Sequence, residues 1–211
     1  MGVAYGKTSW IEDVTQTSPA NFNNMENGIF LANAPLVSSL PVSPVHGQEI
    51  AYIADATAGT IWNLIYNSVT GKWHYKGGAP LYAEVANGGN GVNVGAYADL
   101  GTPGPALTFP FAGDYVVSYG FCAYISNMGN ANPVARMAPR IGNVGPDDQD
   151  SVVAAPGFTV PAGQQHMHSD ARSRKITVTS AVGINMRYSA SGANIPLVDN
   201  RWLSILPVKV G

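Results

Sequence analysis

The stretch DYVVSYGFCAYI, residues 114–125, is the longest β-rich run in the chain. Alternate side chains of an extended strand point to opposite faces, so the odd positions place Tyr, Val, Tyr, Phe, Ala and Ile on one face. The even positions place Val, Ser, Gly, Cys and Tyr on the other, and neither face is properly polar. A sandwich strand buries one face in the core, so we expect another subunit to cover the second face.

A second run, WLSILPV at residues 202–208, is also apolar on both sides. Residues 175–179 and 184–188 instead alternate apolar with polar, as expected when one face of a strand meets water. We therefore predict that the sheet holding residues 114–125 and 202–208 lines an oligomer axis, with threefold symmetry. The predicted interface residues are Val116, Ser118, Gly120, Cys122, Leu203 and Ile205.

The rest of the chain predicts a mainly β protein with an antiparallel jelly-roll sandwich at the C-terminus. From about Leu81 onward, β-rich runs alternate with Gly- and Pro-containing loops, which favours a sandwich or jelly roll. Residues 35–80 are predicted to form a Pro-rich connector and a small β-meander, with strands at 49–53, 60–66 and 72–75. We expect three segments: an N-terminal anchor at 1–34, this middle segment, and a head domain at 81–211.

The N-terminal stretch carries the helix signal. Ser18 can cap the first amides, Pro19 suits the first turn, and the apolar residues of the anchor helix recur at helical spacing: Phe22, Met25 and Ile29. We therefore predict a short helix over residues 19–32. Its other face carries asparagines, so it needs a partner, which could be its own domain, a symmetry mate or a larger particle.

Composition limits the classes of function. Charged residues make up 11% of the chain, against roughly 25% in an average globular protein, and there are 24 glycines and 15 prolines. The net charge of −2 gives no basic surface for nucleic acid. We expect a soluble protein made in a cytoplasm, without a signal peptide or membrane insertion, because no segment approaches the length of a membrane span.

Catalytic and cofactor motifs are few. No G-x-S-x-G pentapeptide occurs, and the glycine-rich residues 88–95 lack the helix and Lys of a phosphate-binding loop, so we predict a connector there and no enzyme. The acidic residues near 147–150 lack the rest of a calcium loop, and we favour a solvated loop. His166 and His168 could bind one metal from the same side of a strand, although packing histidines are the favoured interpretation, and no cofactor is expected otherwise.

Two parts of the sequence resemble known families. Residues 10–13, 18–29 and 40–50, with Trp62, Tyr66 and Trp73, resemble the opening of bacteriophage tail-fibre and baseplate-associated proteins. Residues 113–119 and 201–205 are similar to the inner and closing strands of trimeric jelly rolls of the tumour-necrosis-factor and C1q type. The resemblance implies a small homotrimeric virion protein that binds another virion protein through its N-terminal part.

Two roles fit that resemblance. The leading one is a phage fibre or spike whose head contacts a host surface glycan or protein through the loops at 101–105, 126–133 and 142–151. The alternative is a capsid-attached head fibre or decoration protein without a dedicated receptor role. Aromatic residues in loops could bind glycans, and the candidates are Tyr82 and Tyr97. A carbohydrate-cleaving tail enzyme finds no supporting motif.

Overall fold

The computed structural model describes residues 34–86, 90–92, 95–126, 134–155, 165–191 and 196–211. The predicted anchor helix with Phe22, Met25 and Ile29 lies outside these residues, as does most of the predicted loop at 126–133. Residues 36–211 form one compact unit. No helix in the described part of the chain is long and apolar enough to cross a membrane.

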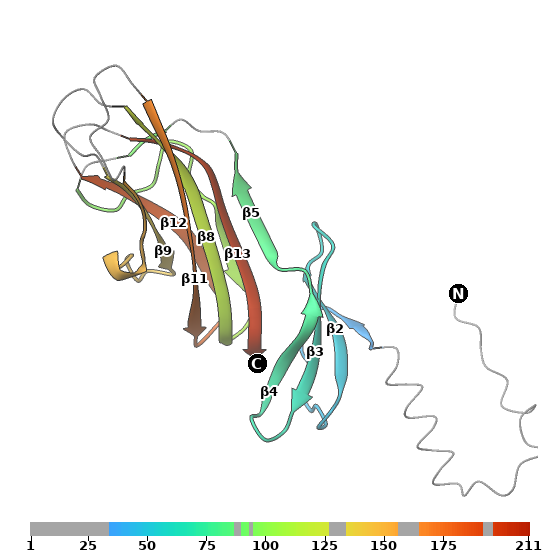
Figure 1. Ribbon diagram of the computed structural model, residues 1–211. Helices are drawn as coiled ribbons and strands as arrows, with labels where there is room; N and C mark the ends of the chain where they lie inside the picture. The colour runs from blue at the N-terminus through green and yellow to red at the C-terminus, as the bar shows by residue number, and fades with distance from the viewer. Residues whose placement is uncertain (1–33, 87–89, 93–94, 127–133, 156–164, 192–195) are drawn as a thin grey trace, which may run out of the picture. The chain divides into compact units, whose positions relative to one another are not determined.

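The described residues are almost entirely β structure (Figure 1). A single turn of 3-10 helix, η1 (Asp148–Asp150), lies between two of the strands. The strands are β1 (Leu36–Val37), β2 (Glu49–Asp55), β3 (Thr60–Asn67), β4 (Lys72–Gly78), β5 (Leu81–Val85), β6 (Asn90–Gly91), β7 (Ala106–Phe109), β8 (Gly113–Ser126), β9 (Val134–Ile141), β10 (Val152–Ala154), β11 (Gln165–Val178), β12 (Val182–Ser191) and β13 (Leu197–Val210).

The C-terminal part is a jelly-roll sandwich, which confirms the predicted fold class. One sheet runs β5-β13-β8-β11 and the other runs β10-β9-β12-β7, so strands distant in sequence are neighbours in both sheets. This order, with crossings between the two layers, is that of eight strands wound as two Greek keys. Strands β8, β11 and β13 lie side by side, with β9 and β12 in the second layer (Figure 1).

Strand β13 joins the meander to the head. One side of it pairs with β8, while the other side pairs in succession with β6, β5 and β4. The meander β2–β4 therefore extends the first sheet of the head. Its aromatic residues pack on the head as well, since the ring centroids of Tyr52 and Phe111 are 4.8 Å apart and those of Trp62 and Tyr115 are 6.4 Å apart. The two parts share one hydrophobic core.

Candidate self-association face

The odd-numbered residues of β8 from Tyr115 to Ala123 face the second sheet and are buried within the chain. Tyr115, Val117, Tyr119 and Ala123 have no exposed surface, and Phe121 is 2% exposed. Their polar atoms are satisfied locally. The Tyr115 hydroxyl donates to the carbonyl oxygen of Phe111 at 2.9 Å, and the Tyr119 hydroxyl donates to the backbone carbonyl of the η1 residue Asp150. This inner face needs no other subunit to cover it.

The even-numbered residues of β8 lie on the opposite surface of the same sheet, which we call the outer face. Directly paired residues of neighbouring antiparallel strands share a face, so the register gives its other members. The outer face consists of Tyr82 and Glu84 on β5, Leu197, Asp199, Trp202, Ser204 and Leu206 on β13, Val116, Ser118, Gly120, Cys122 and Tyr124 on β8, and Met167, Ser169, Ala171, Ser173 and Lys175 on β11.

The register corrects one part of the predicted interface. Val116, Ser118, Gly120 and Cys122 lie together on the outer face, whereas Leu203 and Ile205 do not. Leu203 pairs with Tyr119 and Ile205 pairs with Val117, so both belong to the inner face, and both have no exposed surface. The β13 residues that lie beside the predicted β8 set are instead Trp202, Ser204 and Leu206, which pair with Gly120, Ser118 and Val116. Sequence alternation identified two faces on β13 but not which of them the core would take.

A bulge in β13 moves Trp202 into the outer face. The four residues of β13 from Asp199 to Trp202 oppose the three residues of β8 from Gly120 to Cys122, and Asn200 has a positive φ of 44°. Asparagine tolerates this left-handed conformation better than most residues, because its short polar side chain bonds locally. The extra residue sends Arg201 inward and Trp202 outward.

Trp202 lies across Gly120. A Cβ atom at Gly120 would be 2.8 Å from the indole Nε1 of Trp202 and 2.9 Å from the Cβ of Ala171. Gly120 itself is buried under this cover. The absence of a side chain at residue 120 is therefore what lets the indole approach the backbone of β8.

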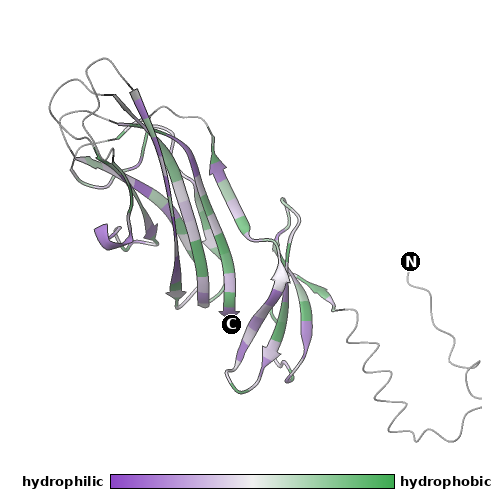
Figure 2. Ribbon diagram, viewed as in Figure 1, coloured by the Kyte–Doolittle hydropathy of each residue, from purple (hydrophilic) through white to green (hydrophobic). Residues whose placement is uncertain are grey.

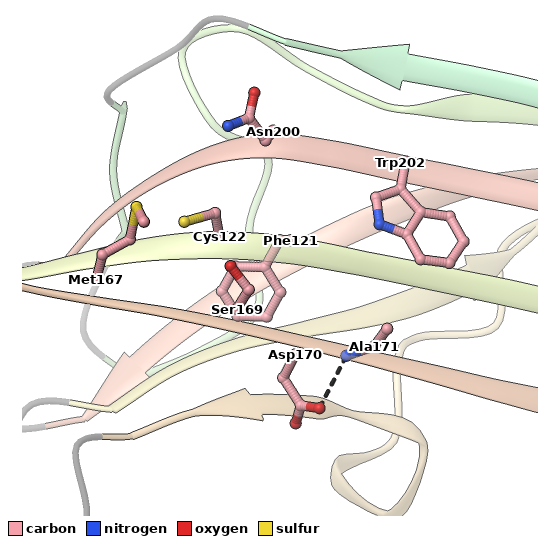
Figure 3. A pocket seen from close by; sticks show the side chains of 8 residues that line it. All are labelled: Phe121, Cys122, Met167, Ser169, Asp170, Ala171, Asn200 and Trp202. Carbon is pink, nitrogen blue, oxygen red and sulfur yellow. Dashed lines mark hydrogen bonds between the residues drawn. The ribbon is translucent and has the colours of Figure 1, made fainter.

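A shallow depression of about 600 Å³ lies beside Trp202 on this sheet (Figure 3). Small or flexible side chains form much of its lining, namely those of Cys122, Met167, Ser169 and Ala171. Asn200 and the strand pair Phe121 and Asp170 complete it. The predicted interface residue Cys122 is 5% exposed there, as a free thiol.

Polarity on the outer face is concentrated away from its centre. The five β8 residues are uncharged, and the hydroxyls of Ser118 and Ser173 hydrogen-bond each other at 2.6 Å. With both faces of each strand coloured, Figure 2 shows more hydrophobic colour along β8 and β13 than along β11, which is mostly hydrophilic. Exposed apolar side chains surround the centre: Tyr82 is 54% exposed, Met167 59% and Leu197 42%.

One end of the outer face carries a compact charge cluster around Asp114. Its carboxylate lies 2.8 Å from the ammonium of Lys175 and 3.4 Å from that of Lys209, and it accepts a 2.6 Å hydrogen bond from the Thr177 hydroxyl. The ammonium of Lys175, with the Thr177 hydroxyl, lowers the pKa of Asp114 from 3.8 to about 2. The cluster fixes the ends of β8, β11 and β13 to one another.

His166 and His168 lie at the start of β11, on the same side of the strand. They pair with Ile125 and Ala123, so they belong to the inner side of the sheet, and their ring centroids are 6.4 Å apart. Among the described residues, no group of three or more His, Cys, Asp and Glu side chains is placed to hold a metal ion. Metal binding by this pair stays a prediction.

The acidic loop before β10 is tied to β11. Asp150 forms an ion pair with Arg174, and Arg172 donates to the backbone carbonyls of Gln149 and Ser151 at 2.5 and 3.3 Å. Asp148 accepts a 2.9 Å hydrogen bond from the hydroxyl of Tyr97. The loop is thus anchored at one edge of the sandwich, and Tyr97 is engaged with it rather than presented to solvent.

Arg201 anchors a second loop and was not predicted to have a role. Its side chain has no exposed surface, and its Nη1 donates to the carbonyl oxygens of Thr102 and Gly104 at 2.8 and 3.2 Å. The hydroxyl of Tyr188 also donates to Gly104, at 2.7 Å. In the sequence, the sign of a role for Arg201 is its place beside a tryptophan at the start of an apolar run. That its side chain points inward depends on the bulge at Asn200.

Comparison with known proteins gives limited similarity. No protein-family model and no curated protein matches the chain. A chain in the structure of the infectious bursal disease virus Gt strain is 13% identical, with a TM-score of 0.34, and the match covers 82% of this chain. The corresponding values for the Gx strain are 12%, 0.32 and 79%. This chain spans about 40% of the length of these neighbours, at 40% and 39% respectively.

Proposed function

We propose that the chain is a structural, non-catalytic protein of a virus particle that associates with two further copies of itself through the outer face. The assignment to a virus particle rests on the resemblance of residues 10–13, 18–29 and 40–50 to phage fibre proteins. The self-association rests on the physical character of the outer face. Under this proposal the head presents loops to a host surface while the N-terminal part binds another virion protein.

The observation that carries the self-association is the outer surface of β8. Its inner surface is already covered by the second sheet, yet the outer surface from Val116 to Tyr124 holds only uncharged residues. Exposed Tyr82, Met167 and Leu197 lie around it. Depletion of charge at the centre with aromatic and Met side chains nearby is typical of subunit interfaces.

The anchored loops support a binding role for the head. Arg201 holds the loop at 101–105 from inside the sandwich, and Arg172 with Arg174 holds η1 from β11. Loops fixed by a rigid scaffold lose less conformational freedom on contact with a partner. The described loops are therefore suited to contact a host surface without an enzymatic step.

Light scattering tests the self-association. The intact protein should have three times its monomer mass of 22.1 kDa at micromolar concentration. Ser118→Arg places a charge at the centre of the outer face and should leave a folded monomer. Val69→Arg is the matched control, because Val69 is 88% exposed in the turn between β3 and β4, and it should keep the mass of the parent. A parent of 22.1 kDa, or an unchanged mass in Ser118→Arg, refutes the proposal.

Labelling of intact particles tests the location. An antibody against the head should mark fibres or spikes of virions, and label over the capsid surface would replace the fibre role with that of a head fibre or decoration protein. Label absent from particles would refute the virion assignment. Release of sugars from host surface glycans by the purified protein would refute the non-catalytic role.

A further inference from the structure

One border and one end of the outer face carry charges that the described residues leave unbalanced. On β5, the carboxylate of Glu84 accepts a 2.8 Å hydrogen bond from the Tyr82 hydroxyl and has no ion-pair partner among the described residues. At the Asp114 end of the outer face, the ammonium groups of Lys175 on β11 and Lys209 on β13 share the single carboxylate of Asp114. Lys175 and Lys209 have side chains 60% and 42% exposed.

These charges cannot meet within one chain. In the strand register, Glu84 on β5 lies opposite Trp202 on β13. Trp202 lies opposite Gly120 on β8, and Gly120 lies opposite Ala171 on β11, so Glu84 is three strands away from β11. Lys175 is four residues further along β11. With strands ~4.8 Å apart and ~3.3 Å per residue, the two side chains start about 20 Å from each other. At that distance their attraction is screened at physiological salt.

We propose that Glu84 of one copy lies against the Lys175 and Lys209 ammonium groups of a second copy, so that the β5 border of each copy packs on the β11 end of the next. The inference rests on the proposed self-association and assigns the two surfaces that meet. Each copy then offers an acidic border to one neighbour and a basic end to the other. Contacts between two different surfaces propagate in one direction, and they close into a ring when the rotation from one copy to the next is a whole fraction of a turn, as in the proposed trimer.

Simple twofold packing of two outer faces does not bring Glu84 onto Lys175. A dyad parallel to the strands places β5 over the other copy's β11. It does not shift a residue along the strand direction, so Glu84 stays about 13 Å from Lys175 in that direction. A dyad in the sheet plane and perpendicular to the strands places β5 over β5, which keeps Glu84 away from Lys175 on β11 at any height of the axis. The ring is therefore the arrangement that the charges favour.

Neutralising the acid tests the electrostatic part. Glu84→Gln should weaken association about tenfold in low salt and less than twofold in 0.5 M NaCl, since screening removes the contribution of the charge. Glu49→Gln is the matched control, because Glu49 already pairs with Lys76 at 2.6 Å in the meander, and it should change association little. Asp199, another acid on the outer face, accepts a hydrogen bond from the backbone amide of its neighbour Asn200 at 2.9 Å. A loss in Asp199→Asn as large as that in Glu84→Gln would overturn the assignment to Glu84.

Cross-linking tests the arrangement. Cys122→Ser removes the single cysteine, and Glu84→Cys with Lys175→Cys in that background introduces two thiols at the surfaces expected to meet. A short bismaleimide should join three chains covalently, whereas either single-thiol variant should stay unlinked. Three outcomes would each overturn the arrangement. They are covalent dimers from Glu84→Cys alone, a final product of two chains from the double variant, and no cross-link in a protein that scatters as a trimer. A monomeric parent would instead refute the self-association itself, so the two failures are distinguishable.

Discussion

The inner and outer faces of β8 differ far more in their surroundings than in their composition. Tyr119 on the inner face is enclosed by the second sheet and has no exposed surface, whereas Ser118 beside it is half-buried with no second layer above it in the described chain. Both faces lack charge along the middle of the strand. An uncharged surface on both faces of one strand can therefore serve two purposes. One face stabilises the fold of the chain, and the other can contact another chain.

The largest effect on stability should come from truncating an inner-face side chain of β13, compared with the same truncation on its outer face. Leu203→Ala removes a side chain with no exposed surface and should cost about 2–5 kcal/mol of unfolding free energy, because the core cannot fill the cavity. Leu206→Ala, three residues along on the outer face, should cost under about 1 kcal/mol in the monomer. Urea unfolding over a range of protein concentrations measures both. A Leu203→Ala variant of full stability and altered mass would place that residue in the subunit interface after all.

The charge cluster at the end of the outer face should give a smaller effect that depends on pH. Asp114→Asn should lower the unfolding free energy by roughly 1.5–3 kcal/mol at neutral pH, since it loses charge-assisted hydrogen bonds. The carboxyl pKa is about 2 in the folded chain and 3.8 ordinarily, so its contribution is complete above pH 4 and disappears as pH falls to 2. Unfolding of parent and variant at several pH values should show the two curves converging below pH 4. A constant difference down to pH 2 would exclude ionisation of Asp114 as the cause.

The smallest effect on the unfolding free energy should come from adding a methyl group at Gly120, which has no side chain to separate the β8 backbone from Trp202. Gly120→Ala should cost about 1–3 kcal/mol because the new Cβ overlaps the indole of Trp202 and the β11 backbone. Displacement of the indole should also change its fluorescence, and Trp202→Phe supplies the reference spectrum. Gly77→Ala is the control, since no atom lies within 4 Å of a Cβ there. Equal stability of the two alanine variants would show that Trp202 does not lie across Gly120.

Part of the candidate site could be predicted from sequence because strand alternation is a local property. The run at 114–125 is strand β8 within one residue at each end, and its even positions do share a face. The error at Leu203 and Ile205 has a non-local cause. Relative register between β13 and β8 is set by the bulge at Asn200 and by pairing across the sheet, neither of which leaves a periodic signal in the sequence.

The sequence by itself determined that the chain is a β protein, where its strands lie, and that two strands are apolar on both faces, because these follow from residue type and a period of two. The tertiary structure alone decided which face the core takes, which residue covers Gly120, and that Glu84 lies three strands away from Lys175. Burial and charge separation depend on contacts between segments far apart in the chain, and local patterns do not encode them.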